Sequence, residues 1–127
     1  MSKTAYICSR YRADTQEQFD EQMRYTKTFA HEAVMAGDDV IVPHMYYPQF
    51  LDDNNKTERK LGMESAIRLL HKCDIVLVYI GLGVSEGMEA EIEEAKKQNK
   101  KMCYFGDIND VRPILETLDI DQGVDYD

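Results

Sequence analysis

The segment Ile75–Ile80 is the feature that most constrains the fold, because it is an unbroken run of large, mostly β-branched apolar residues. A strand with water on one face alternates apolar and polar residues, whereas a strand covered on both faces is apolar throughout. The run therefore predicts a central parallel strand with helices on both sides.

Strand and helix patterns alternate along the rest of the chain. Further strands are expected at Thr4–Ser9, Asp39–Val42 and Lys101–Phe105, and helices at about 15–35, 57–72, 86–98 and 111–118. This βαβαβαβα order predicts an α/β fold: a doubly wound, Rossmann-like or flavodoxin-like parallel sheet of four to five strands with helices on both faces.

The helix boundaries and buried faces follow from local signals. Ala36-Gly37 should end the first helix, and Thr57 is a plausible N-cap for the second. We expect the first helix to bury Phe19, Met23, Thr26, Ala30, Ala33 and Val34. The second should turn Met63, Ile67 and Leu70 inward, and the segment from His44 to Asn55 is expected to be a loop.

Length, charge and cysteine usage narrow the function classes. The 127 residues fit one domain, 1–127, with an acidic tail from about residue 119. A net charge of −9 disfavours binding to a nucleic-acid polymer but allows a small anionic ligand in a local pocket. The sequence shows neither a membrane-spanning run nor a signal-peptide pattern, so the expected location is the cytoplasm. Cys8, Cys73 and Cys103 lack metal-ligand spacing and are expected to be reduced structural thiols, with no metal site.

Ligands of such sheets bind beyond the carboxyl ends of the strands, which directs attention to the loops after Ser9, Val42 and Ile80. The first loop begins with Ser9, Arg10 and Arg12, and guanidinium groups match phosphate oxygens. The same residues are equally typical of a solvated basic turn that pairs with acids such as Asp14 and Glu17.

The third loop leads into Ser85-Glu86-Gly87, where a serine and free backbone N–H groups at a helix start can bind an anion. Ser85 as a plain N-cap is the more common outcome. On the helix that follows, Glu91 lies about 60° from the core-facing direction, on the border of the buried face. A partly desolvated carboxylate there suits a nucleophile, and it equally suits a half-exposed acid in a salt bridge.

Three further residues have two interpretations each. Asp74 stands at the amino end of the buried strand, where it is either functional or a turn residue. Tyr6 is either at the pocket or in the core, and His44 is the one histidine expected near the pocket, since His31 should face solvent.

Taken in order, three motifs resemble those of the nucleoside 2-deoxyribosyltransferases, and more closely the nucleoside 5′-monophosphate N-glycosidases of the same superfamily. They are Tyr6-Ile-Cys-Ser-Arg-Tyr-Arg12, Cys73-Asp-Ile-Val-Leu-Val78 and Ser85-x-Gly-x-x-x-Glu91, and the match spans about residues 4 to 105. The segment from His44 to Asp53, followed by Arg59, is similar to a branch of small bacterial and phage proteins without an assigned reaction.

The resemblance implies specific roles. Glu91 matches the nucleophile that attacks the anomeric carbon. Asp74 matches an aspartate near the sugar or base and is the expected acid for the leaving base. Tyr6 matches a tyrosine at the pocket wall. Ser85 and Arg12 match phosphate-binding residues, and we expect Ser9, Arg10, Gly87 and His44 to line the same site. The resemblance implies no cofactor. It does imply homo-oligomers whose subunits complete one another's sites. Tyr46, Tyr47 and Phe50 suit either base stacking or, slightly better, a subunit interface.

Three functions are therefore compared. The leading hypothesis is an N-glycosidase or deoxyribosyltransferase that acts on a nucleotide or nucleoside through a glycosyl-enzyme intermediate. The second is a protein that binds a nucleotide or nucleotide-like signal in the same pocket without turnover. The third, an interaction domain with no ligand, rests on the fact that a fold alone does not imply a function.

Overall fold

The computed structural model describes residues 3–123, with side chains to residue 118. Four strands form one parallel sheet in the order β2-β1-β3-β4: β1 (Thr4–Cys8), β2 (Asp39–Ile41), β3 (Ile75–Tyr79) and β4 (Lys101–Phe105). This arrangement confirms the predicted α/β class and the positions of the strands.

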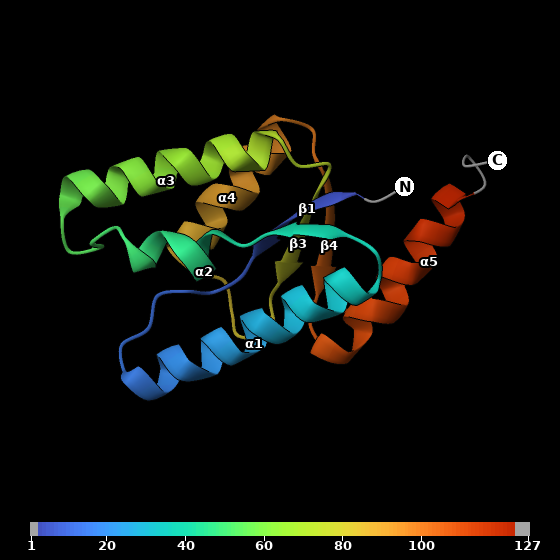
Figure 1. Cartoon of the computed structure of the whole chain (residues 1–127), viewed down its shortest axis with the longest axis horizontal. Coiled ribbons are helices and arrows are strands. Elements are labelled where there is room, and N and C mark those ends of the chain that lie inside the picture. Colours follow the sequence, from blue (N-terminus) through green and yellow to red (C-terminus); the bar gives the residue numbers. More distant parts are fainter. Residues whose placement is uncertain (1–2, 124–127) are drawn as a thin grey trace.

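The helices cover both faces of the sheet, as predicted (Figure 1). α1 (Gln16–Met35) and α5 (Val111–Gly123) lie on one face, and α3 (Lys56–His71) and α4 (Glu86–Lys97) lie on the other. Every residue of β3 is buried, and its side chains alternate between the two layers. Ile75, Leu77 and Tyr79 join the α1/α5 core, while Val76 and Val78 join the α3/α4 core.

α1 is bounded by a capping threonine, which the sequence analysis did not single out, and by the predicted glycine. The Thr15 hydroxyl accepts a hydrogen bond from Gln18 N at 3.1 Å. Gly37 follows the last turn with φ 104°, a left-handed conformation that glycine adopts without strain. The buried face overlaps the predicted one only in part: Thr26 and Ala33 are buried as predicted, Gln22 and Phe29 are buried as well, and Val34 is exposed.

The segment after β2 is not the loop that the sequence predicted. Pro43 starts a short helix, α2 (Pro43–Tyr46), and a 3-10 turn, η1 (Tyr47–Gln49), follows directly. Proline suits a first helical position because its ring fixes φ and no backbone donor is lost there. A second 3-10 turn, η2 (Ile108–Asp110), precedes α5.

α3 corrects two expectations. Its N-cap is Asn55, not Thr57: the Asn55 side chain accepts hydrogen bonds from the backbone N–H groups of Thr57 and Glu58. Leu70 is its one buried residue, and Met63, expected to face inward, is 49% exposed. Only the C-terminal end of α3 is therefore firmly packed.

The C-terminal helix is longer than expected, since α5 runs to Gly123. The end of the predicted acidic tail, residues 124–127, lies outside the described residues. Within residues 3–123, no helix is both long enough and apolar enough to cross a bilayer.

Candidate functional site

A cavity of about 740 Å³ opens at the carboxyl ends of β1 and β3. These two strands are neighbours in the sheet, yet their helices leave on opposite faces, so the loops diverge at this point. The loop after β1, the segment after β2 and the loop after β3 all line the cavity, and the first half of α3 closes its far side. Its size and position suit a ligand as large as a nucleotide.

Glu91 lies in the wall of this cavity, half-buried, as its position on α4 predicted. Two donors from β1 reach its carboxylate. The Tyr6 hydroxyl donates a hydrogen bond to Oε2, and the Cys8 thiol lies 3.7 Å from Oε1. Tyr6 and Cys8 are both fully buried. The two donors on β1 therefore fix the orientation of the carboxylate, which still lines the cavity and can reach a ligand there.

The same surroundings set the protonation of Glu91. Burial raises its pKa to about 7, although the hydrogen bonds from Tyr6 and Cys8 act in the opposite direction. Burial and the nearby carboxylate raise the pKa values of Tyr6 and Cys8 far above their usual ranges, so both remain protonated donors. Glu91 thus titrates near neutral pH, where a carboxyl group can act both as nucleophile and as acid or base.

We expect this raised pKa to make the free energy of unfolding depend on pH. The folded pKa of about 7 lies above the ordinary 4.5, so the group's stabilising contribution is complete below pH 4.5 and is lost as the pH rises through 7. Glu91→Gln cannot ionise, so its stability relative to the wild type should increase by about 2–3 kcal/mol between pH 4 and pH 8. Urea denaturation of both proteins across this range measures the difference.

His44 contributes to the pH dependence of the free energy of unfolding with the opposite sign. Its pKa is lowered to about 4, chiefly by burial, so its contribution is complete above pH 6.5 and is lost as the pH falls through 4. Because wild type and Glu91→Gln share His44, the difference between them isolates Glu91. A difference that stays constant from pH 4 to pH 8 would show that the pKa of Glu91 is ordinary.

The donors from β1 give a second prediction. Tyr6→Phe removes the larger of the two hydrogen bonds that lower the pKa of Glu91, so that pKa should rise. Any activity that needs the Glu91 carboxylate should then reach half its maximum at a higher pH than in the wild type. Cys8→Ala should shift this midpoint in the same direction by less. A pH–rate profile for each variant measures it, and a midpoint unchanged in Tyr6→Phe would refute the assignment.

Ser85 and Gly87 occupy the start of α4, at the cavity wall. The Ser85 hydroxyl accepts a hydrogen bond from Met88 N at 3.3 Å, so Ser85 is an N-cap as well as a cavity residue. Near Gly87 a Cβ atom would meet only Ser85 Oγ, at 4.0 Å, which leaves the backbone open to a ligand. Arg10 Nη1 lies 3.4 Å from where a Cβ on Gly83 would stand, so its guanidinium group lies against the loop that leads to Ser85.

The loop after β1 is held by groups that sequence patterns did not single out. The buried Gln22 side chain donates to the carbonyl groups of Tyr11 and Arg12, at 3.0 and 3.1 Å. The Ser9 hydroxyl is buried and lies 2.8 Å from Thr26 Oγ1. Ser9 therefore anchors the loop to α1, and Arg12 is exposed at the rim of the cavity.

His44 lies in the cavity wall, as expected, and belongs to an aromatic cluster. Its ring stacks on Tyr11 with centroids 4.7 Å apart, and Tyr11 meets Phe19 edge-on at 5.5 Å. The low pKa of His44 keeps it neutral at pH 7. Burial raises the pKa of Tyr11, and the nearby Asp53 raises it further. This wall offers flat apolar surface beside one carboxylate, which suits a heteroaromatic base.

Asp74 is not part of this site. It stands at the amino end of β3, opposite the end from which the cavity opens, and it does not line the cavity. Its Oδ2 accepts a hydrogen bond from Thr4 N at 2.9 Å and so joins the start of β1 to the start of β3. In this chain Asp74 has the structural role of a turn residue, and its expected role as the acid for the leaving base is wrong.

The site also contains residues that sequence reasoning missed. Cys8 follows Tyr6 by two positions in one strand, so strand alternation alone places both on the face that carries α4. Arg59 and Asp53 line the cavity from α3 and the segment before it, and the sequence indicated that the segment after Val42 lies at the site without identifying these two residues as part of it. In the part of the chain that the structure describes, no group of three or more His, Cys, Asp or Glu side chains is placed to hold a metal ion.

Comparison with known proteins identifies a relative in fold and a family. A solved structure of a 2-deoxyribosyltransferase from the psychrotolerant bacterium Bacillus psychrosaccharolyticus superposes with a TM-score of 0.68 and 16% sequence identity. The superposition covers 86% of this chain and 90% of the other, and it shows a shared fold. No curated protein matches the sequence.

A family model gives the closer assignment. Its description is "Domain of unknown function (DUF7768)", and it matches residues 3–105, from the start of β1 to the end of β4. The matched region includes the whole sheet, the nucleophile candidate Glu91 and all three loops of the cavity. The chain therefore belongs to the DUF7768 domain family, with the fold of the deoxyribosyltransferases.

Proposed function

We propose that this protein cleaves or transfers the N-glycosidic bond of a nucleotide or nucleoside, with Glu91 as nucleophile. The observation that carries the proposal is a half-buried carboxylate, oriented by Tyr6 and Cys8, in the wall of a nucleotide-sized cavity. The fold shared with a 2-deoxyribosyltransferase supports the same class of chemistry.

In the proposed reaction, a Glu91 oxygen attacks the anomeric carbon and the carbon–nitrogen bond to the base breaks. The electron pair of that bond leaves with the base, whose nitrogen takes a proton from water, and the hydroxide so formed is neutralised by the proton that hydrolysis of the glycosyl ester later releases. A glycosyl ester on Glu91 remains, as in retaining glycosidases. Water then hydrolyses the ester, or a second base displaces it, and Glu91 returns as a carboxylate. Tyr6 acts as a positioning residue for Glu91.

The proposed phosphate site follows from the placement of α4. Ser85 precedes Glu91 by six residues, which corresponds to about 9 Å along the helix axis. A sugar with a 5′-phosphate spans a comparable length, so a phosphate at Ser85, Gly87 and Arg10 leaves the anomeric carbon near Glu91. The N-terminus of α4 and the Arg10 guanidinium both favour an anion there. Arg12 and His44 extend the binding surface.

The test is base release from a panel of nucleosides and nucleoside 5′-monophosphates, ribo and deoxy, followed by chromatography. Release that depends on Glu91 supports the proposal and identifies the substrate. Addition of a second free base distinguishes transfer from hydrolysis, because only a transferase forms the new nucleoside. A full panel without release, at several pH values from 5 to 9, would contradict the proposal.

One observation favours a second function, which is nucleotide binding without turnover. The carboxyl group expected to protonate the leaving base, that of Asp74, lies away from the cavity. A binding protein needs Arg10, Ser85 and Gly87 but has no need of Glu91. Stabilisation of both wild type and Glu91→Gln by a nucleotide, with no base released, would identify this function.

We also propose that the protein is a cytoplasmic homo-oligomer that needs no cofactor. The resemblance of its three motifs to those of the deoxyribosyltransferases is the basis for this proposal. Sedimentation velocity gives the mass in solution, and a monomer over the whole micromolar range would contradict the assembly.

A further inference from the structure

Three arginines line the cavity without a protein partner. Arg10 and Arg12 belong to the loop after β1, and Arg59 belongs to the first turn of α3. Among residues 3–123, none of the three guanidinium groups makes an ion pair or a hydrogen bond. Because the exposed Arg68 makes none in this range either, the position of the three around one cavity is the informative feature. The chain has 24 acidic and 15 basic side chains, so acidic partners are plentiful. Unpaired arginines that gather around one cavity indicate an anionic ligand.

A single bound phosphate does not account for all three arginines. A phosphate at the start of α4 carries about two negative charges, and the helix N-terminus and Arg10 already face that position. Arg12, in the loop after β1, and Arg59, on α3, remain unassigned. Both are exposed residues of the cavity lining.

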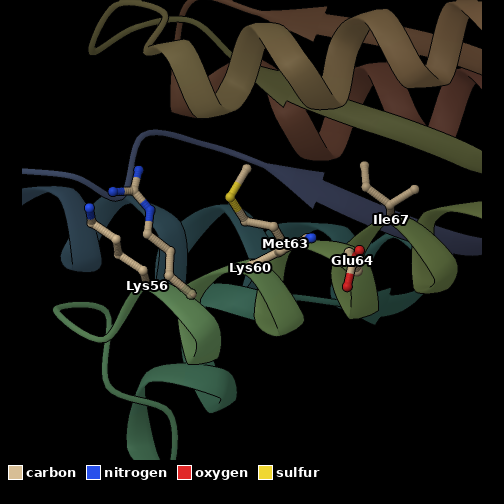
Figure 2. Close-up of a pocket in the computed structure, with 6 residues that line it drawn as sticks. Lys56, Lys60, Met63, Glu64 and Ile67 are labelled. Atoms are coloured by element: carbon tan, nitrogen blue, oxygen red, sulfur yellow. The ribbon is translucent and has the colours of Figure 1, made fainter.

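The charge around Arg59 is mixed. Lys56 and Lys60 lie near it on α3, while Glu64 lines the adjoining groove and five carboxylates line the cavity, those of Asp14, Asp53, Glu58, Glu86 and Glu91. A shallow groove of about 530 Å³ runs along α3, lined by Lys56, Arg59, Lys60, Met63, Glu64 and Ile67 (Figure 2). Arg59, Met63 and Ile67 line both the groove and the cavity, so the two spaces adjoin. In Figure 2 the Lys56 and Met63 side chains project from the same face of α3. The cavity thus opens onto three cations within two turns of one helix.

We propose that this site takes a nucleotide with more than one phosphate: the first phosphate lies between Arg10 and Ser85, and the following phosphates reach Arg12 and Arg59. The positive charges of Lys56 and Lys60 favour the ligands with the longest phosphate chains. This inference rests on the proposed nucleotide site and names its ligand class, a nucleoside di- or triphosphate or a nucleotide joined through a diphosphate.

Inorganic anions test the phosphate chain without knowledge of the base. Thermal unfolding of the full chain is followed with phosphate, pyrophosphate and tripolyphosphate, in EDTA and at low ionic strength. Arg59→Gln is compared with Arg68→Gln, an exposed arginine on the same helix that lines neither space. We expect pyrophosphate to bind at least about tenfold more tightly than phosphate. Arg59→Gln should lose most of this difference in affinity, and Arg68→Gln should retain it.

Nucleotides then separate this inference from the proposed function. The probes are adenosine and cytidine 5′-mono-, di- and triphosphates, and affinities are measured by calorimetry on Glu91→Gln so that no turnover occurs. Equal affinity for mono- and diphosphates, or equal effects of Arg59→Gln and Arg68→Gln, would overturn the inference even if monophosphates release their base. Tighter diphosphate binding that depends on Arg59, with no base released by the wild type, would support the ligand class and contradict the glycosidase.

Discussion

Glu91→Gln is expected to lower base release by at least about 10³-fold while leaving nucleotide affinity within a few-fold of the wild type. Glutamine has nearly the same shape, and its amide oxygen can still accept the hydrogen bond from Tyr6, whereas its NH2 group cannot accept the one from Cys8. It cannot form the glycosyl ester, because a neutral amide oxygen is a far weaker nucleophile than a carboxylate. Single-turnover assays with calorimetric affinities separate the two effects.

A matched control for this variant lies two residues earlier on the same helix. Glu89 is exposed and does not line the cavity, so Glu89→Gln removes the same charge without touching the site. Its base release should remain within about twofold of the wild type, because exposed charges interact weakly through water. Equal losses in both variants would mean that the net charge of α4 matters and that Glu91 is not the nucleophile.

The largest loss of stability is expected for Phe29→Ala, at about 3–5 kcal/mol. Phe29 is fully buried, and its ring meets those of Tyr79 at 5.7 Å and Phe105 at 5.4 Å, both edge-on. It therefore joins α1 to β3 and β4, and the cavity left by alanine is lined by rings that cannot collapse into it. Urea denaturation monitored by circular dichroism measures the change.

Phe50→Ala is the comparison for that measurement, because Phe50 is 65% exposed and contacts only the edge of the Tyr47 ring among the aromatic residues. Its loss should be below about 1 kcal/mol. Similar values for the two variants would show that Phe29 does not lie in a close-packed core.

The fold was predictable because its signals are local or periodic. The unbroken run of β3 required cover on both faces, and Thr15 and Gly37 are residue types with a strong preference for helix ends. The cap of α3 shows the limit of such signals. Asn55 and Thr57 are both good capping residues, and the choice depends on which side chain reaches the free N–H groups.

The site was predictable only in part, because its contacts join distant segments. Helix geometry placed Glu91 at the border of the buried face, but its bond to Tyr6 spans 85 positions and depends on how α4 lies over β1. The sequence already placed Asp74 at the amino end of β3, opposite the carboxyl ends where ligands bind, and only its position in a motif suggested a role in the site. The cover formed by α2 and α3 depends on tertiary packing that no periodicity reports.

The two sides of the cavity differ in how deeply they are packed, because Leu70 is the single buried residue of α3. One wall is built on the sheet and α4. The other is a helix that joins the core at Leu70, contacts Gln98 through His71 at 2.9 Å and meets the segment after β2 through the hydroxyl groups of Ser65 and Tyr47. Arg59 lies eleven residues, or about 16 Å, from Leu70, so a tilt of about 10° about that point displaces it by roughly 3 Å. We expect such a tilt to take the segment after β2 with it, since Ser65 and Tyr47 are bonded, and to widen the opening for ligands of different length. Glu91 and its two donors lie on α4 and β1, so tolerance of size is separated from accuracy at the reacting bond.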